Sequence, residues 1–567
     1  MEDGRLQWRT EEVRGSASTG PHPPWLASRS GGFPDRAPAF VSNMSLPRPS
    51  VLTALTAILC VGVAVVACTL TDYGVSWDEP MQSRYAEKVI LYFQTFGADR
   101  SCNDLVFMKY NNTLVDLVAA LIHGVYPAAK FEIRHAVSAA LALLTVPALV
   151  RLGRRLGWEW AGVVGALFLL TTPPFYGHAF VNTKDIPFAC FFAWTMDALA
   201  ALVTRRTGRL REFLALGLAA GLTAAVRPGG LVMLAAIFVA TIAHAAITRR
   251  SEWGLLRGWA LLAKSFAALV VAWSVMVAPW PWAHENVLLN PVRAIRVASS
   301  FPNTFPFLFN GQRVWSNRLP WYYVVEFFLI TTPLPMLVLA CLGMLDGFRR
   351  VVREPRSPAS AAAWVALLWT LLPVVAWTAT RPNIYDGIRH FLFVFPALAF
   401  WAGQGGARLM SLPGRRAVRV AIAGGLVAAV VWPVHQIVRL HPYQLTYFNE
   451  LVGGLRGAEG RFETEYWLTS YKEAVEWLND RADRSGQTVG IYVATISEAV
   501  ECARYYCGPH VRVRLANFYA PLTGPFPPDI DYFVSTTRFR HDENYPMART
   551  VKTIGREGAV FTVIKAP

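Results

Sequence analysis

The chain has 567 residues, of which 54% are hydrophobic and 16% are charged. An ordinary soluble protein carries about 25% charged residues, so the composition excludes that class and indicates a polytopic membrane protein. The formal net charge is +16, but the arginines fall in short clusters between apolar runs. Such clusters are typical of cytoplasmic loops. Because they form no single basic surface, we expect no nucleic-acid partner.

Residues 1–50 precede the first apolar run and are rich in Arg, Ser, Gly and Pro. They show no apolar periodicity, so we expect a disordered cytoplasmic tail. Met44 lies close to the first apolar run, and either Met1 or Met44 could be the start of translation. No cleavage site of small residues follows that run, so we interpret it as a membrane span and not as a signal peptide.

About 20 apolar residues cross the hydrocarbon core of a bilayer. By this measure, residues 51–439 are predicted to form a polytopic α-helical module of about eleven transmembrane helices. The predicted spans lie near residues 51–70, 133–150, 160–175, 187–204, 212–226, 229–247, 259–279, 321–345, 361–379, 388–405 and 417–438. The fifth and sixth spans are short and are separated only by "RPGG".

Arg-rich connections such as "RLGRRLG", "TRRTGRLR" and "GFRRVVREPR" occur in every second loop. The positive-inside rule therefore places the N-terminus in the cytoplasm and the C-terminus outside. The external segments are then 71–132, 176–186, 227–230, 280–320, 380–387 and the chain after about residue 440.

The first external loop begins with "WDEP", residues 77–80. Pro80 suits the first turn of a helix, and Met81, Tyr85, Val89 and Tyr92 would share one face of it. We therefore expect a helix that lies in the membrane interface and begins with two acids, Asp78 and Glu79. An acid in this place is also a common helix cap, so a cap and a functional carboxylate are both open.

The second external loop, "YGHAFVNTKDIPF", contains His178, Lys184 and Asp185 at a helix start. One His and one Asp are too few ligands to predict a metal site. The alternatives are a helix cap with a satisfied histidine, or an acid beside a cation that faces the same cavity as Asp78.

The sequence "TRPNIYDGIRHFLFVFP" flanks the outer end of a later span and contains Arg381, Tyr385, Asp386 and Arg389. Arginine on the external side opposes the positive-inside bias. It therefore indicates either a bound phosphate or an acidic neighbour such as Asp386.

Residues 440–567 have a different pattern. "YWLTSYKEAVEWLND" predicts an amphipathic helix with Trp467, Tyr471, Val475 and Leu478 on one face. "TVGIYVAT", "VRVRL", "IDYFVST" and "AVFTVIKA" predict short strands, and "ISEAVECARYY" predicts a second helix. We expect a small external α/β domain packed on the outer face of the membrane.

Together, "WDE", "KDIP" and "YDGIRHFLFVFPAL" resemble motifs of the GT-C membrane glycosyltransferases, in particular the group with the protein O-mannosyltransferases and the lipid A aminoarabinose transferase. "HPYQLTYFNELVGGLRGAEGRFETEYWLTSYKEAVEWLN" resembles a segment of bacterial members of that group. The likeness extends from about residue 51 to 480. It implies an enzyme that takes a sugar from a polyprenyl-phosphate carrier at the outer face of a bacterial plasma membrane. "MKYNNTLVDL" stands where the family has a His/Lys-Pro-Pro stretch, which leaves the acceptor open.

The resemblance also implies an acid from each of the first two external loops at the acceptor, and these map onto Asp78 with Glu79 and onto Asp185. The chemistry agrees, because displacement at an anomeric carbon needs a base for the acceptor proton. A departing phosphate needs neighbouring cations and no acid. We expect Asp78 to be the base, with Glu79 or Asp185 orienting the acceptor, and a single displacement to invert the anomeric carbon.

Arg381 or Arg389 is the expected ligand of the donor phosphate, and Lys184 is a further candidate. The remaining candidates for substrate binding are Tyr385, Asp386 and His178. No metal and no cofactor is expected. The acceptor could be a lipid, a protein or a glycan.

Other functions stay open at this point. A transporter or flippase of lipid-linked sugars would also need external ionisable groups, although transporters often place them at mid-membrane depth and show repeated halves. A membrane scaffold would use the acids only as helix caps. An oligosaccharyltransferase-type enzyme or a mycobacterial-like arabinosyltransferase would share the architecture, but the metal-binding acid motifs of the former are not apparent.

Overall fold

The structure, a computed structural model, describes residues 50–105, 107–111, 113–127, 129–205, 208–248, 259–299, 304–494, 497–516 and 521–567. The predicted cytoplasmic tail therefore lies outside the described residues, except for Ser50. The described residues from Ser50 to Pro567 form one compact unit.

Membrane-length apolar helices dominate the described part of the chain. Seven of its helices are long and apolar enough to cross a bilayer. They are α1 (Val51–Thr69), α4 (Lys130–Arg155), α7 (Asp185–Arg205), α9 (Gly230–Thr248), α10 (Trp259–Val277), α15 (Pro358–Thr380) and α17 (Arg416–Leu440). The prediction of a polytopic α-helical membrane protein is confirmed.

Two further apolar segments are helix pairs with a sharp bend. Helix α5 (Glu159–Leu170) meets α6 (Pro173–Val181) at an angle of 67°. Helix α13 (Tyr323–Thr331) meets α14 (Leu334–Arg353) at 118°. In both pairs a proline follows the break, and proline fits the first turn of a new helix but not the interior of an old one.

The predicted count of about eleven spans is not confirmed, because the described residues give seven spans, or up to nine if each broken pair counts as one. The runs near 212–226 and 388–405 form α8 (Leu210–Ala224, 15 residues) and α16 (Phe395–Met410, 16 residues). Both helices are shorter than the roughly 20 residues that a full crossing needs.

Helix α16 is nevertheless deeply buried, between α5 and α14. A Cβ on Gly403 would lie 2.0 Å from the Ala161 carbonyl oxygen, and a Cβ on Gly405 would lie 2.0 Å from that of Leu339. Small residues let membrane helices approach backbone to backbone. This packing fixes α16, which directly follows the short η4 helix (Arg389–Val394), between its two neighbours.

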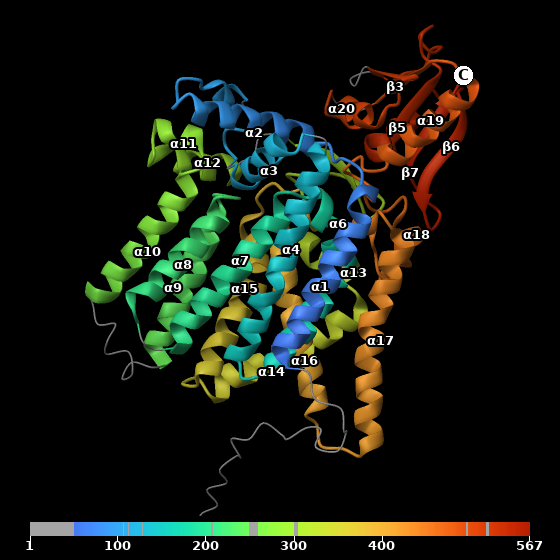
Figure 1. Ribbon diagram of the computed structural model, residues 1–567. Coiled ribbons are helices and arrows are strands. Elements are labelled where there is room, and N and C mark those ends of the chain that lie inside the picture. Colours follow the sequence, from blue (N-terminus) through green and yellow to red (C-terminus); the bar gives the residue numbers. More distant parts are fainter. Residues whose placement is uncertain are drawn as a thin grey trace, which may run out of the picture. The chain divides into compact units, whose positions relative to one another are not determined.

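The loop of residues 71–132, predicted to be external, contains α2 (Asp78–Gln94) and α3 (Leu114–Val125), which lie with α11 (Pro281–Glu285) and α12 (Leu289–Ser299) at one end of the long helices (Figure 1). A hairpin of β1 (Pro306–Phe309) and β2 (Gln312–Trp315) follows α12. The predicted apolar face of α2 packs inward. Tyr85 and Val89 are buried, and Met81 and Tyr92 pack beside them.

The C-terminal domain contains a five-stranded sheet in the order β4-β3-β5-β7-β6. Strand β3 pairs in parallel with β4 and β5, and β7 pairs antiparallel with β5 and β6. The helices are α18 (Gly454–Ala458), α19 (Tyr471–Ser485) and α20 (Ser497–Tyr506), and the strands are β3 (Val489–Val493), β4 (Val511–Leu515), β5 (Tyr532–Thr536), β6 (Arg549–Arg556) and β7 (Ala559–Ala566). The predicted small α/β domain is confirmed.

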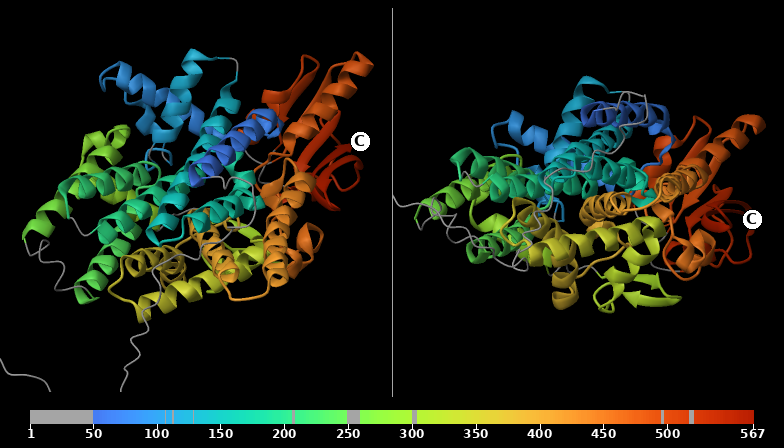
Figure 2. Two further views of the ribbon diagram at one scale, coloured as in Figure 1. Left: turned by 60° about the horizontal axis from the view of Figure 1, so that its bottom comes forward. Right: turned by 90° about the horizontal axis from the view of Figure 1, so that it is seen from below.

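Four of the five strands were expected, and β6 was not. Its sequence "RTVKTIGR" is charged and mostly unburied, because an edge strand shows no long apolar run. The domain lies beside α17 and away from α8–α10 in both orientations of Figure 2. The domain boundary at residue 440 stays a prediction.

The C-terminal domain is tied closely to the first external loop. Arg84 on α2 forms ion pairs with Glu498 (3.4 Å) and Glu501 (2.6 Å) on α20. A Cβ on Gly74 would lie 2.0 Å from the Thr469 carbonyl oxygen. The start of α2 is thus held against the chain that leads into α19.

Candidate active site

Charged residues from four separate segments meet at the external-loop end of the helices. Asp78 is the first residue of α2, and Asp185 is the first residue of α7, directly after Lys184. Arg389 begins η4, and Arg227 lies in the turn between α8 and α9. The bend between α5 and α6 turns the chain into Asn182, beside Asp185.

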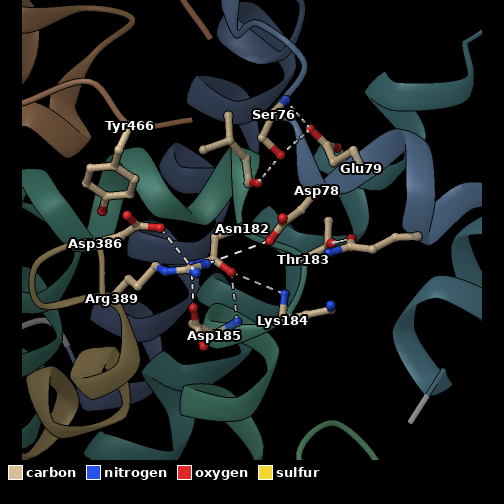
Figure 3. Close-up of polar contacts among 12 residues, drawn as sticks. Ser76, Asp78, Glu79, Asn182, Thr183, Lys184, Asp185, Asp386, Arg389 and Tyr466 are labelled. Atoms are coloured by element: carbon tan, nitrogen blue, oxygen red, sulfur yellow. Dashed lines mark hydrogen bonds and ion pairs between the residues drawn. The ribbon is translucent and has the colours of Figure 1, made fainter. Parts of the chain in front are cut away.

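The two adjacent acids of "WDE" have different surroundings. The Asp78 side chain is 34% exposed and lies 3.7 Å from Arg389, carboxylate oxygen to guanidinium nitrogen. The Glu79 side chain is 0% exposed and points toward Ser76 (Figure 3). It accepts hydrogen bonds from the Ser76 backbone N–H (2.8 Å) and hydroxyl (3.0 Å). Asp78 is therefore the accessible acid, and Glu79 caps the loop.

A buried network supports Glu79 from the side of α4. His135 Nε2 and Arg134 Nε lie 3.2 and 3.8 Å from the Glu79 carboxylate. Arg134 also donates to Asp116 (2.6 Å) and to Gln82 (2.5 Å). Because Glu79 and these partners are all buried, we assign Glu79 a positioning role.

Asp185 is also tightly held. Its carboxylate accepts hydrogen bonds from Asn182 (2.9 Å) and from Arg227, and the residue is 3% exposed. The guanidinium of Arg227 is about one-third exposed. Asp185 therefore orients the Arg227 guanidinium. Its own carboxylate is occupied by these two hydrogen bonds and is less suited to act as a base.

Arg389 lies between Asp386 and Asp78 (Figure 3). The rings of Tyr385 and Trp467 lie 4.7 and 5.1 Å from its guanidinium carbon, close enough for cation–π attraction. Asp386 is 0% exposed and also pairs with Arg538 from the C-terminal domain. Arg389 is thus a fixed, desolvated cation beside the accessible acid.

Lys184 is partly buried, and in the described part of the chain its ammonium group makes no hydrogen bond or ion pair. Burial lowers its pKa, while the nearby Asp78 and Asp116 oppose that shift. The site contains four cations, namely Lys184, Arg227, Arg389 and Arg538. Among them Lys184 has no direct ion-pair partner in the described residues, because Asp116 pairs with Arg134. A cation without a direct partner can attract an anion.

A hydrogen-bonded chain links this site to the C-terminal domain. The Tyr466 hydroxyl lies 3.1 Å from His178 Nε2, and His178 Nδ1 lies 3.3 Å from the Asn182 amide nitrogen. Burial raises the pKa of Tyr466, so this residue remains a neutral hydrogen-bonding group. His178 is 1% exposed and connects Tyr466 to the residues around Asp185.

The structure brings together all but one of the predicted site residues. Arg381 ends α15 in a left-handed conformation (φ 45°) and is exposed. Within the described residues it makes no hydrogen bond or ion pair with Asp78 or Asp386, so Arg389 and not Arg381 is the arginine of this cluster. No group of three or more metal-ligating side chains occurs among the described residues.

Three residues of the site were not predicted: Arg227, Arg538 and Tyr466. Arg227 in "RPGG" was within an external segment, and an external arginine was itself a usable signal. Arg538 lies in a domain that shows no site motif, 152 residues after its partner Asp386. Nothing in its local sequence points to Asp386.

The fold and these charges define a polytopic membrane protein with a buried, cation-rich site near the membrane surface. Residues 113–282 match the family model described as "Dolichyl-phosphate-mannose-protein mannosyltransferase". This match confirms the predicted resemblance, and the chain is a membrane glycosyltransferase. No curated protein matches the chain.

Solved structures with similarity include the Archaeoglobus fulgidus oligosaccharyltransferase in the apo form, at 12% identity and a TM-score of 0.48, covering 86% of this chain and 69% of that one. ArnT from Cupriavidus metallidurans bound to undecaprenyl phosphate has 14% identity and a TM-score of 0.48, and the match covers 90% of this chain and 97% of ArnT. Arabinofuranosyltransferase AftD from Mycobacteria has 12% identity and a TM-score of 0.43, and the match covers 92% of this chain and 42% of AftD.

Proposed function

We propose that the chain transfers a sugar from a polyprenyl-phosphate carrier to an acceptor at the external face of the membrane, with inversion at the anomeric carbon. The observation that supports this best is the pairing of one accessible acid, Asp78, with the buried cation Arg389 at 3.7 Å. The description of the matching family, which names a dolichyl-phosphate sugar, supports the class of donor.

In this mechanism the Asp78 carboxylate takes the proton of the acceptor hydroxyl. The acceptor oxygen forms a bond to the anomeric carbon, and the bond from that carbon to the phosphate oxygen breaks. Its electron pair stays on the lipid phosphate. Arg389 and Lys184 stabilise that developing charge, and Arg227 adds a third cation. One displacement from the face opposite to the phosphate inverts the configuration.

The remaining residues position these groups. Asp185 orients Arg227 and Asp386 orients Arg389, while Glu79 fixes the turn that presents Asp78. Tyr385 packs on the Arg389 guanidinium, and His178 joins Tyr466 to Asn182. We assign these residues to positioning and substrate binding, and no step requires a metal.

The charge distribution supports the external location. The site lies at the start of α7, whereas Arg154 and Arg155 end α4, Arg205 ends α7 and Arg353 ends α14. Under the positive-inside rule these ends face the cytoplasm, so the opposite ends, with Asp78, face outward. The likeness of residues 441–479 to bacterial relatives supports a bacterial plasma membrane, with residues 51–439 as the catalytic module and 440–567 as a periplasmic domain.

The test is to incubate the purified full chain with a panel of polyprenyl-phosphate sugars and a mixture of lipid, peptide and glycan acceptors. We expect consumption of one donor, release of polyprenyl phosphate and inverted product by NMR. Asp78→Asn should lower the rate by 10²–10⁴-fold, the usual contribution of a general base, with unchanged yield and melting temperature.

Normal turnover by Asp78→Asn would exclude Asp78 as the base. A product with retained configuration would exclude the single displacement. If vesicles moved the donor across the bilayer without consuming it, the protein would be a flippase.

A further inference from the structure

A second cavity lies between α4, α7 and α8, near the ends that carry the arginines. It has a volume of about 510 Å³. Most of its wall is apolar, and this part consists of Leu144, Phe191, Trp194, Ala198, Ala201, Ala215, Leu218, Ala219 and Leu222. The rest of the wall is charged and consists of Arg151, Asp197, Arg205, Arg211 and Glu212.

This cavity is separate from the active site. Asp185 and Asp197 lie on the same helix, α7, twelve residues apart, which places them roughly 18 Å apart along the axis. Asp197 is 2% exposed and accepts from Arg151 (2.8 Å) and Arg155 (2.7 Å). Arg151 also lies 5.4 Å from the Trp194 ring centroid. Two arginines therefore neutralise the buried acid and fix one wall.

Two further arginines of the cavity have no such partner. Arg205, the last residue of α7, and Arg211, in the first turn of α8, are both exposed and make no hydrogen bond or ion pair within the described residues. The Arg151 side chain is also 49% exposed. The charged end of the cavity thus has a surplus of positive charge directly beside an apolar wall.

We propose that this cavity binds an anionic phospholipid, with an acyl chain against the apolar wall and the phosphate at Arg205 and Arg211. The walls belong to membrane helices, so their apolar surface faces hydrocarbon. A basic pocket between such helices suits an anionic head group. A water-soluble phosphate would gain nothing from the apolar wall, and a zwitterionic lipid would bring a second, positive charge to the arginines.

The test uses the full chain in nanodiscs that contain equal amounts of phosphatidylglycerol and phosphatidylcholine, and native mass spectrometry counts the lipids that remain bound. We expect the wild type to retain phosphatidylglycerol selectively. The double variant Arg205→Gln/Arg211→Gln should lose that selectivity, with about fivefold weaker binding per arginine removed.

The matched control is Arg349→Gln/Arg353→Gln on α14. These arginines are exposed, make no ion pair within the described residues and lie on the helix that contacts the end of α4 through Arg350. A second variant, Ala219→Phe, fills the apolar part and should release the lipid without a change in charge. Its melting temperature shows whether it is folded.

Equal loss of phosphatidylglycerol in both double variants would show ordinary surface attraction and overturn the proposal. Equal retention of both lipids by the wild type would overturn it as well. Because the readout is bound lipid, these results do not depend on sugar transfer, and a failure of the proposed reaction would leave them unchanged.

Discussion

At the scale of single residues, the adjacent acids Asp78 and Glu79 show how burial separates two chemically similar groups. Asp78 keeps a third of its side chain exposed and contacts one cation at long range. Glu79 has no exposed side-chain surface and at least three partners. The same motif thus provides one accessible carboxylate and one structural carboxylate.

Glu79→Gln should therefore lower stability more than it changes chemistry. Removing one partner of a buried ionic network costs on the order of 3–5 kcal/mol, because Arg134 would lose a compensating charge. We expect a clearly lower melting temperature, and normal donor affinity in the fraction that remains folded. Unchanged stability of Glu79→Gln would contradict the capping role.

Lys184 gives the site a testable pH dependence. Its pKa is lowered by burial, so the ammonium group loses its proton at a lower pH than a free lysine with a pKa of about 10.4 does. Donor binding that depends on this charge should be complete at low pH and weaken as the pH rises through the lowered pKa.

The measurement is donor affinity against pH for the wild type, Lys184→Gln and Lys184→Arg. The Gln variant should bind weakly throughout and lack the alkaline decline. The Arg variant keeps its charge at every pH used, and should therefore bind without that decline. An identical decline in all three proteins would assign it to another group.

At the scale of elements, the site depends on where helices begin. Asp78, Asp185 and Arg389 each open a helix, and the two acids sit at N-termini, where the helix dipole favours negative charge. Helix α2 is fixed in turn by the chain before α19, because Gly74 touches Thr469. The close contact between these backbones requires a residue without a side chain.

Gly74→Ala should disturb this contact, since its Cβ would lie 2.0 Å from the Thr469 oxygen. We expect a large loss of transfer activity and faster proteolysis of residues 440–567. Gly124→Ala on α3 is the control, because a Cβ there meets no atom within 4 Å. Similar behaviour of both variants would show that the contact does not position the site.

At the scale of the whole molecule, the C-terminal domain completes the site. Arg538 is 1% exposed and pairs with Asp386, which also holds Arg389. It further lies 4.3 Å from the Trp77 ring centroid, beside Asp78. One side chain thus connects the domain with Trp77 before α2 and with Asp386 before η4.

Arg538→Gln should leave the buried Asp386 with only Arg389 as a cationic partner. We expect a loss of stability on the order of 3 kcal/mol and a reduced rate of transfer, measured by thermal unfolding and donor consumption. Arg540→Gln is the control, since Arg540 is exposed and its one ion pair among the described residues is with the nearby Glu543. A wild-type rate in Arg538→Gln would exclude a role in the site.

Much of this organisation was predictable, because long apolar runs and the charges between them obey a simple length and sidedness rule. The external motifs around Asp78, Lys184 and Arg389 were found on that basis. The number of spans was not predictable in the same way. An apolar run does not show that α16 is buried although it is too short to cross the membrane, or that the chain bends between α5 and α6 and between α13 and α14. Arg227 and Arg538 were missed because their partners are distant in the sequence.

The bond between Arg538 and Asp386 also has a consequence for the order of events during synthesis. The ribosome adds Asp386 152 residues before Arg538, and Arg389 149 residues before it. The nascent protein therefore has its membrane helices, but not the complete cluster around Asp386 and Arg389, until Arg538 has been synthesised. If this cluster faces outward as proposed, Arg538 must also cross the membrane before the cluster can form.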